Sequence, residues 1–378
     1  MKQKIEENII IKLLIIIIIL FFFNFNYILY NIFLNYLFSY AFEIKRIEKY
    51  FSLCNSGRLI IRNKLKRIKF PKVSIISPVH NREKFILRFI RSIQNQKFND
   101  IEIIFIDDFS RDRSIKQIEK YQEKDERIIL IKNKKNKGTL ISRNIGALNS
   151  RGEYLVFSDP DDIISKNIIN FCYNFIKTKN YEMLRFNLCS SHKIVLGTRG
   201  LENKIITQPE LSTFLFYAKN KLRQIDYIIA NKFIKRKAFI RALNSVNDYY
   251  LNLYMTFAED GLMNYILYRN AKSLFYIKKV GYYYYKNNQS ITESKFSDNN
   301  IRSYFYNLKL IFEYSKNNNY EKKMASRYFH AYFSRINNGI LKNIIKKDCK
   351  FYNKIIEMYL NCEFISNKNK RKLKSIKC

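Results

Sequence analysis

The sequence predicts an α/β protein whose main domain is built on a largely parallel sheet. From Pro71 onward, short apolar runs alternate with stretches of helical periodicity. This alternation is typical of strand–helix–strand units, whose successive strands lie parallel. Acidic pairs also stand directly after two of the predicted strands. Because such sheets bind ligands at the carboxyl ends of their strands, the same pattern predicts where a site lies.

The expected elements follow one another without long gaps. Strands are predicted at Val73–Ser77, Ile101–Ile106, Arg127–Lys132 and Tyr154–Phe157. Helices are predicted at 83–95, from Ser110 or Asp112 to about 124, at 139–150 and at 163–176. In the first of these helices, Phe85, Ile86, Phe89, Ile90 and Ile93 share one face, as a helix packed on a sheet requires. After about Asn299 the sequence is again helical in character.

The N-terminal region predicts a membrane anchor. No charged residue occurs between Lys12 and Glu43, and Leu13–Phe23 is uninterrupted hydrocarbon. The stretch is long enough to cross a bilayer and longer than a usual signal-peptide core, so we expect an uncleaved helix. A cleaved signal peptide, with Ser39–Ala41 as the cleavage site, is the alternative. Basic residues are more frequent after the stretch than before it, which weakly favours a cytosolic main domain over a Golgi or ER luminal one.

The strong positive charge does not by itself predict a nucleic-acid partner. The chain carries 69 Lys+Arg against 32 Asp+Glu, a formal net charge of +37. Its basic residues are spread along the whole chain, and the abundant Lys, Asn, Ile, Tyr and Phe all have A/T-rich codons. No DNA- or RNA-binding motif accompanies the charge, so we expect no nucleic-acid partner. Widely separated histidines and cysteines without a Cys-x-x-Cys pair also argue against a zinc site.

The acidic residues after the predicted strands are the candidate site. Asp159, Asp161 and Asp162 follow Tyr154–Phe157, and Asp107-Asp108 follow Ile101–Ile106. Carboxylates at this edge suit a hard divalent cation that holds a phosphate-bearing ligand. The alternative is that Asp161 or Asp162 caps the next helix. Two clusters at the same edge favour the ligand site.

A known family shares these features in the same order. The relevant segments are Val73-Ser-Ile-Ile-Ser-Pro-Val-His-Asn81, Ile103-Ile-Phe-Ile-Asp-Asp-Phe-Ser-Arg-Asp112, Asn136-Lys-Gly138 with Ser142-Arg-Asn-Ile-Gly146, and Gly152-Glu-Tyr-Leu-Val-Phe-Ser-Asp-Pro-Asp-Asp162. Over 73–177 the chain resembles the GT-A-fold glycosyltransferases of family 2. The resemblance implies a nucleotide-sugar donor, most often a UDP-sugar, and a glycan or other hydroxyl acceptor. The residues it places at the donor are Ser77, Pro78, Val79, Asn81, Asp107, Asp108, Lys137, Gly138, Arg143 and Asp159.

The resemblance also implies a metal ion. In the family pattern Asp161 binds Mn²⁺ or Mg²⁺, with Asp159 beside the ribose or a metal-bound water. Asp162 is left as a helix cap. This chain departs from the pattern at Pro160, where a small residue is more frequent, and at His80, where a Tyr is usual. Proline removes only a backbone donor and does not prevent chelation.

A second acidic pair supplies the predicted base. Phe257-Ala-Glu-Asp-Gly261 resembles the family's acceptor-side motif, in which Asp260 deprotonates the acceptor hydroxyl and Glu259 supports substrate binding. A single base opposite the leaving group implies inversion at the anomeric carbon. The alternative is that Glu259 and Asp260 only complement a helix N-terminus. A catalytically inactive GT-A module serving as a carbohydrate binder or scaffold is the rival function.

Two later segments resemble the polysaccharide-building branch of the family, and together these features predict a division of the chain. The two segments are Ala230–Arg236 and Gly281–Thr292, the second with tyrosines that could stack on sugars or fill the core. The expected parts are a membrane anchor (1–42), a basic connector (43–70), a nucleotide-sugar-binding half (71–177), an acceptor-side half (178–297) and a helical C-terminal extension with a basic tail (298–378).

Overall fold

The computed structural model describes residues 71–190, 193–194, 204–208, 210–213, 228–285, 297–315 and 345–361, with isolated positions between 318 and 375. The predicted membrane anchor and basic connector lie outside these residues. In the part of the chain that is described, no helix combines the length and the apolar character needed to cross a membrane.

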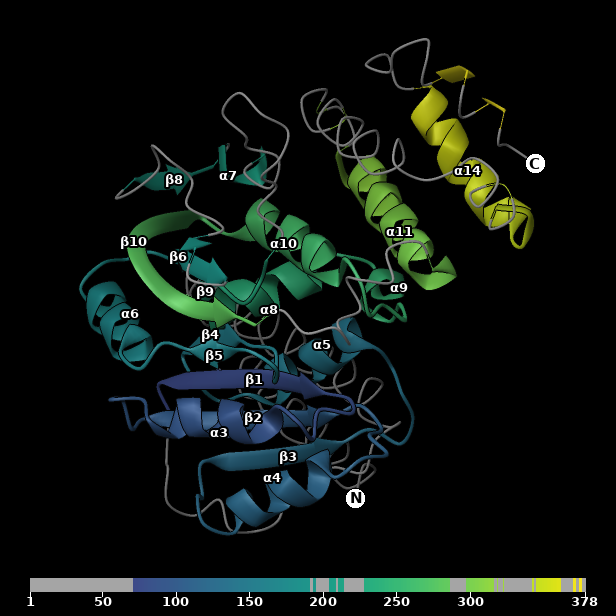
Figure 1. Cartoon of the computed structure of the whole chain (residues 1–378). Coiled ribbons are helices and arrows are strands. Elements are labelled where there is room, and N and C mark those ends of the chain that lie inside the picture. The colour runs from purple at the N-terminus through teal and green to yellow at the C-terminus, as the bar shows by residue number, and fades with distance from the viewer. Residues whose placement is uncertain are drawn as a thin grey trace, which may run out of the picture. The chain divides into compact units, whose positions relative to one another are not determined.

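A mixed sheet forms the centre of the fold. Its strands are β1 (Val73–Val79), β2 (Ile101–Asp107), β3 (Ile128–Lys132), β4 (Tyr154–Phe157), β5 (Ile163–Ile164), β6 (Met183–Ser190), β7 (Lys193–Ile194), β8 (Ile205–Thr207), β9 (Lys232–Lys235) and β10 (Ser273–Tyr284). They are ordered β3-β2-β1-β4-β9-β6-β10-β5, with β7 on β6 and β8 on β10. Strands β1 to β4 pair in parallel, as predicted, and lie side by side in Figure 1. The short β9 is antiparallel to both of its neighbours.

Helices connect the strands and cover the sheet. They are α3 (Ile86–Gln94), α4 (Ser114–Gln122), α5 (Thr139–Asn149), α6 (Ile168–Lys177), α7 (Glu210–Thr213), α8 (Arg236–Asn244), α9 (Asp248–Leu251), α10 (Glu259–Asn270), α11 (Asp298–Ser315) and α14 (Cys349–Leu360). The predicted strands and helices up to residue 157 are all observed, and their ends differ from the predicted ones by a few residues.

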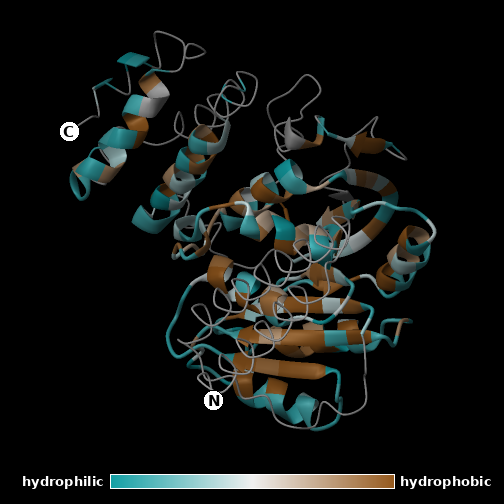
Figure 2. Ribbon diagram, turned by 180° about the vertical axis from the view of Figure 1, so that it is seen from behind, coloured by the Kyte–Doolittle hydropathy of each residue, from teal (hydrophilic) through white to brown (hydrophobic). Residues whose placement is uncertain are grey.

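The sheet is buried on both faces. Ile76 of β1 belongs to one hydrophobic cluster, and its neighbour Ile75 belongs to the other. Leu140 of α5 packs in the first cluster and Phe89 of α3 in the second. Helices on both faces explain why the parallel strands are continuous apolar runs. Figure 2 shows these strands mostly in the hydrophobic colour, whereas the outer helices alternate between polar and apolar residues.

The predicted helix at 163–176 is wrong over its first turn. Ile163 and Ile164 form β5 and pair antiparallel with Tyr283 and Tyr282 of β10, and α6 begins only at Ile168. The apolar pattern fits a helix locally. Pairing with a strand more than a hundred residues later takes precedence, because it buries Ile164 and partly buries Ile163 at the edge of the sheet.

The predicted C-terminal extension is helical where it is described. Helix α11 packs on α10, and Tyr265 donates to the carbonyl oxygen of Ile311 at 3.4 Å. Helix α14 packs on α11, with the rings of Phe305 and Tyr352 edge to face at 4.7 Å. The extension therefore contacts the element that carries the predicted base.

Candidate active site

Both acidic clusters lie at one edge of the sheet. Strands β2 and β4 flank β1 and run parallel to it, with Asp107 opposite Val79 and Phe157 opposite Ile76. The turns that follow the three strands therefore meet at the carboxyl edge, as the sequence predicts.

Asp108 organises the loop that leads into α5. Its Oδ1 accepts hydrogen bonds from Asn133 Nδ2 (2.9 Å) and from the backbone N–H of Lys137 (2.8 Å). Its Oδ2 accepts from the N–H of Gly138 at 2.8 Å. Gly138 has φ of +85°, and a Cβ there would lie 2.8 Å from the carbonyl oxygen of Met255. Asp108 thus holds the loop on which the predicted donor residues Lys137 and Gly138 lie.

Asp107 closes the turn after β2. Its Oδ1 accepts from the N–H of Ser110 at 2.9 Å. Burial is the main cause that raises the pKa of Asp107, and the bonds from Ser110 oppose it. Both carboxylates of the pair therefore engage protein donors, as turn-forming residues do.

The four predicted donor residues at the end of β1 differ in their exposure to solvent. Ser77, Pro78 and Val79 are buried in the strand, so their side chains do not face an open site. Asn81 is exposed in the left-handed conformation (φ 52°), and its Oδ1 accepts from the N–H of Arg111 at 2.8 Å. The placement of Ser77, Pro78, Val79 and Asn81 at the donor stays a prediction, and a contact from the three buried residues would come from their backbone.

His80 occupies the position where the family usually has Tyr. Its Nδ1 lies 2.9 Å from the carbonyl oxygen of Asp108, which makes Nδ1 the donor. Nε2 then accepts from the side-chain amide of Asn81 at 3.2 Å. The imidazole thus ties the loop after β1 to the loop after β2.

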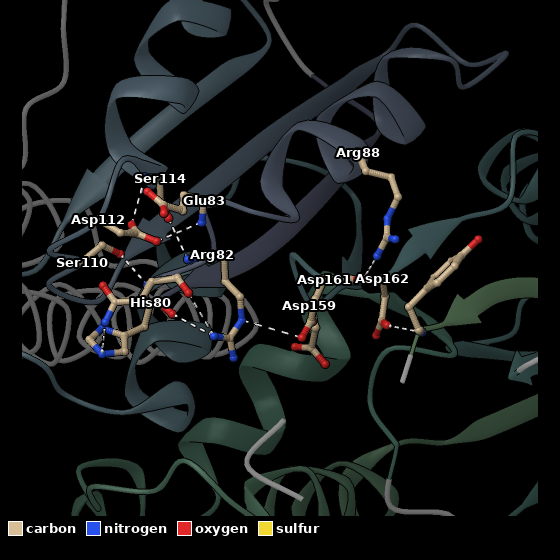
Figure 3. A network of polar contacts seen from close by, with 12 residues as sticks. His80, Arg82, Glu83, Arg88, Ser110, Asp112, Ser114, Asp159, Asp161 and Asp162 are labelled. Atoms are coloured by element: carbon tan, nitrogen blue, oxygen red, sulfur yellow. Dashed lines mark hydrogen bonds and ion pairs between the residues drawn. The ribbon is translucent and has the colours of Figure 1, made fainter. Parts of the chain in front are cut away.

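Two arginines that the sequence did not single out approach the turn after β4. Arg82 lies after β1 with its Nε 3.7 Å from Asp161 Oδ2, and Arg88 of α3 donates to the Asp161 carbonyl. Figure 3 shows both guanidinium groups pointing at the turn that carries Asp159, Asp161 and Asp162. Two positively charged groups from separate parts of the chain therefore converge on the predicted metal ligand.

Arg143 connects the two predicted halves of the site. Its side chain is 2% exposed in α5, and Nη2 donates to Asp159 Oδ1 at 2.7 Å. Nη1 donates to Glu259 Oε1 at 2.9 Å and also to Asp260 Oδ1. The Asp260 Oδ2 atom accepts from the N–H of Ile229 at 3.1 Å. The turn after β4 and the N-terminus of α10 therefore share one guanidinium.

The placement of Arg143 at the donor stays a prediction, while the contacts of its guanidinium with three carboxylates are observed. A guanidinium has five N–H donors in a fixed fork. Burial would lower the pKa of Arg143, but the charges of Asp260, Asp159 and Glu259 outweigh it and raise that pKa. Its charge is thus directed at protein carboxylates. The sequence shows an arginine in a helix, and only the packing of α5 under α10 shows where it points.

Asp162 is not a helix cap, in contrast to the prediction. It is 1% exposed, and Oδ2 accepts from the Tyr282 hydroxyl at 2.7 Å. Oδ1 accepts from the N–H of Tyr285 at 2.9 Å, and the ring of Tyr285 lies 4.0 Å from the Arg88 guanidinium. Burial raises the pKa of Asp162 well above its ordinary value. Asp162 joins the turn to β10, and residue Asn167 stands at the start of α6.

The two carboxylates at the start of α10 that contact Arg143 have raised pKa values. Burial, together with the charge of Asp260, outweighs Arg143 and raises the pKa of Glu259 to about 7. Burial and the charge of Asp159 likewise raise the pKa of Asp260, against Arg143 and Lys232. Raised carboxylate pKa values of this kind are typical of acid–base sites. Lys232, on the strand β9 that the sequence marked only as family-like, is a second cation there.

Asp159 and Asp161 are suited to a divalent cation. Their side chains are 37% and 17% exposed. Mg²⁺ commonly takes one or two carboxylates and completes its shell with water and substrate phosphates. Two partly open carboxylates two residues apart fit that requirement. Within the described residues, no group of three or more His, Cys, Asp or Glu is arranged to hold an ion by itself.

Comparisons with known proteins identify relatives of this chain. The family model described as glycosyl transferase family 2 matches residues 74–243. The uncharacterized glycosyltransferase EpsJ of Bacillus subtilis is 30% identical over 226 residues, 59% of this chain and 63% of EpsJ. An uncharacterized glycosyltransferase of Haemophilus influenzae is 30% identical over 173 residues, 46% of this chain and 67% of that protein.

A third relative has solved structures. The poly(ribitol-phosphate) beta-N-acetylglucosaminyltransferase TarS of Staphylococcus aureus is 27% identical over 215 residues, 56% of this chain and 35% of TarS. The crystal structure of TarS residues 1–349 in complex with UDP-GlcNAc superposes with a TM-score of 0.60 at 19% identity. That match covers 81% of this chain and 87% of the TarS fragment, and it shows a shared fold.

Proposed function

Because the chain belongs to glycosyl transferase family 2, we propose that it moves a sugar from a nucleotide-sugar donor to a hydroxyl of a glycan or glycoconjugate acceptor. The observation that carries this proposal is the contact of Arg143 with Asp159 on one side and with Glu259 and Asp260 on the other. It brings the donor edge of the sheet and a candidate base to the same place. A UDP-sugar is the favoured donor, and UDP-GlcNAc is the first to test, because TarS binds it.

The proposed reaction is a single displacement with inversion. Asp260 accepts the proton of the acceptor hydroxyl while the acceptor oxygen forms a bond to the anomeric carbon. The bond from that carbon to the diphosphate oxygen breaks, and the nucleoside diphosphate leaves with the electron pair. Asp260 is suited to this step, because a base with a raised pKa takes up a proton more readily near neutral pH. Glu259 supports the substrate and shares the charge of Arg143.

Two groups of residues would hold the donor. Asp161, with Asp159, would hold Mn²⁺ or Mg²⁺, which when bound neutralises charge that develops on the departing diphosphate. The loops organised by Asp107 and Asp108, with Asn81, would position the nucleotide. The uncharged stretch between Lys12 and Glu43 supports attachment of the enzyme to a membrane.

A donor screen tests the proposed function. The full-length protein should release nucleotide from one UDP-sugar among a set of UDP- and GDP-sugars, in a reaction that needs Mn²⁺ or Mg²⁺ and stops with a chelator. Asp161→Ala should lose the metal-dependent rate. Asp125→Ala is a matched control, because its ion pair with Arg127 (2.8 Å) precedes β3, at the opposite edge of the sheet. Full activity in chelator would refute the metal assignment, and no release from any donor would favour the inactive module.

The rate should also depend on pH in a way that reports the carboxylate cluster. Asp260 acts as a base only when ionised, and Asp260 and Glu259 share Arg143. With the pKa of Glu259 at about 7 and that of Asp260 raised above 3.8, kcat/KM should fall as the pH decreases below about 7. Donor binding measured at the same pH values separates this effect from loss of donor. A rate that stays constant down to about pH 5 would contradict a base with a raised pKa.

A further inference from the structure

The backbone just before the candidate base adopts an unfavourable conformation. Ala258 precedes α10 with φ of 56° and ψ of 10°, in the left-handed region. Outside glycine this region is sterically costly, and a residue stays there only when its surroundings enforce it. Because Glu259 and Asp260 come directly after Ala258, its dihedral angles set the direction in which both carboxylates leave the chain.

A buried side chain from the C-terminal extension contacts this strained residue. Asn307 of α11 is 3% exposed, and its Nδ2 donates to the carbonyl oxygen of Ala258 at 2.9 Å. The same carbonyl accepts from the N–H of Gly261 at 3.1 Å, within the first turn of α10. Beside it, the rings of Phe257 and Tyr304 pack at 5.5 Å with an interplanar angle of 64°. Helix α11 therefore holds the turn at Phe257 and Ala258 through one hydrogen bond and one ring contact.

We propose that Asn307 is a positioning residue for the reaction: it keeps Ala258 in the left-handed conformation and so aims Asp260 at the acceptor. The inference rests on the proposed role of Asp260. Asn307 belongs to the C-terminal extension, which lies beyond the segment matched by the family model (residues 74–243). The inference therefore assigns this extension a role in catalysis. Without the amide of Asn307, Ala258 relaxes to an ordinary conformation, and Asp260 moves away from Arg143 and from the acceptor.

The first test separates positioning from stability. Asn307→Ala in the full-length protein should lower kcat about tenfold, the effect of one hydrogen bond, and leave the donor KM within about twofold. Ser303→Ala is the matched control, because Ser303 is also buried in α11 and its hydroxyl bonds to the Asn299 carbonyl within the same helix (2.7 Å). The control should keep kcat while it changes the thermal melting temperature by a similar amount. An equal loss of kcat in both variants would show that Asn307 has a structural role and does not position Asp260.

The second test uses the conformational cause directly. Glycine adopts the left-handed conformation without steric cost. Ala258→Gly combined with Asn307→Ala should therefore recover most of the rate that Asn307→Ala loses. No recovery in the double variant would overturn the inference. If Asn307→Ala does not fold, Asn307→Ser, whose hydroxyl is too short to reach the carbonyl, takes its place.

Failure of this inference can be told from failure of the proposed function. Asp260→Asn is measured in parallel. If it retains activity, Asp260 is not the base, and that part of the proposed function fails together with this inference. If it is inactive while Asn307→Ala has a normal kcat, only the role of Asn307 is refuted.

Discussion

Asp260→Asn is expected to lower kcat by about 10²–10⁴, the usual contribution of a general base. Asparagine has the same shape, and its carbonyl oxygen can still accept the N–H of Ile229 that now bonds to Asp260 Oδ2. It cannot take up the proton of the acceptor hydroxyl. The affinity for the nucleotide-sugar should change little, since the donor edge of the sheet is untouched. Turnover by nucleotide release and donor affinity by calorimetry measure the two quantities separately.

The control for this variant is another aspartate in the first turn of a helix. Asp248→Asn changes an exposed residue at the start of α9 and should leave kcat unchanged. A normal rate in Asp260→Asn would show that Glu259 and Asp260 only complement the helix N-terminus. A loss of donor affinity equal to the loss of kcat would place Asp260 in donor binding instead.

Arg143→Met should have the second large effect, on both stability and activity. Removing the guanidinium leaves Asp159, Glu259 and Asp260 close together without their shared countercharge. Breaking a buried ion pair in this way costs about 3–5 kcal/mol of the free energy of unfolding. The remaining carboxylates should also bind protons more tightly, so that Asp260 is protonated and inactive near neutral pH.

The pH dependence of this loss has a definite sign. A carboxylate whose pKa is raised in the folded state binds more protons there than in the unfolded chain, so its contribution to stability falls as the pH rises. The destabilisation by Arg143→Met should therefore be larger at pH 8 than at pH 5, as measured by urea unfolding at both values. Arg241→Met is the control. Its ion pair with Glu182 is 2.6 Å long, but the side chain is 40% exposed, so the loss should stay below about 1 kcal/mol. Equal losses in both variants would contradict a central role for Arg143.

Local pattern was sufficient to predict the first part of the fold. The strands β1 to β4 are continuous apolar runs because helices cover both faces of the sheet. Such runs can be recognised in the sequence alone. The same order places Asp107-Asp108 and the turn at Asp159 on one edge, which the register of β1 with its two neighbours confirms. The proposed roles of Asp161 and Asp260 remain predictions, whereas their placement near Arg82 and Arg143 is observed.

The remaining features depend on contacts between residues distant in sequence. Ile163 and Ile164 have a helical pattern but pair with β10, and Asp162 bonds to Tyr282, 120 residues away. The contact of Arg143 with Asp260 spans 117 residues. Nothing in a local window distinguishes an exposed helical arginine from one that lies beneath another helix. The contact of Asn307 with the Ala258 carbonyl likewise depends on the packing of α11 and has no signal in the local sequence.

The anomeric configuration of the product tests inverting transfer by a single base most directly. Proton NMR of the product, recorded as it forms from an α-linked UDP-sugar and the acceptor that supports turnover, measures it through the coupling of the anomeric proton. A β-linked product is expected, because Asp260 would activate the acceptor on the face opposite the leaving diphosphate. An α-linked product would contradict the proposed displacement.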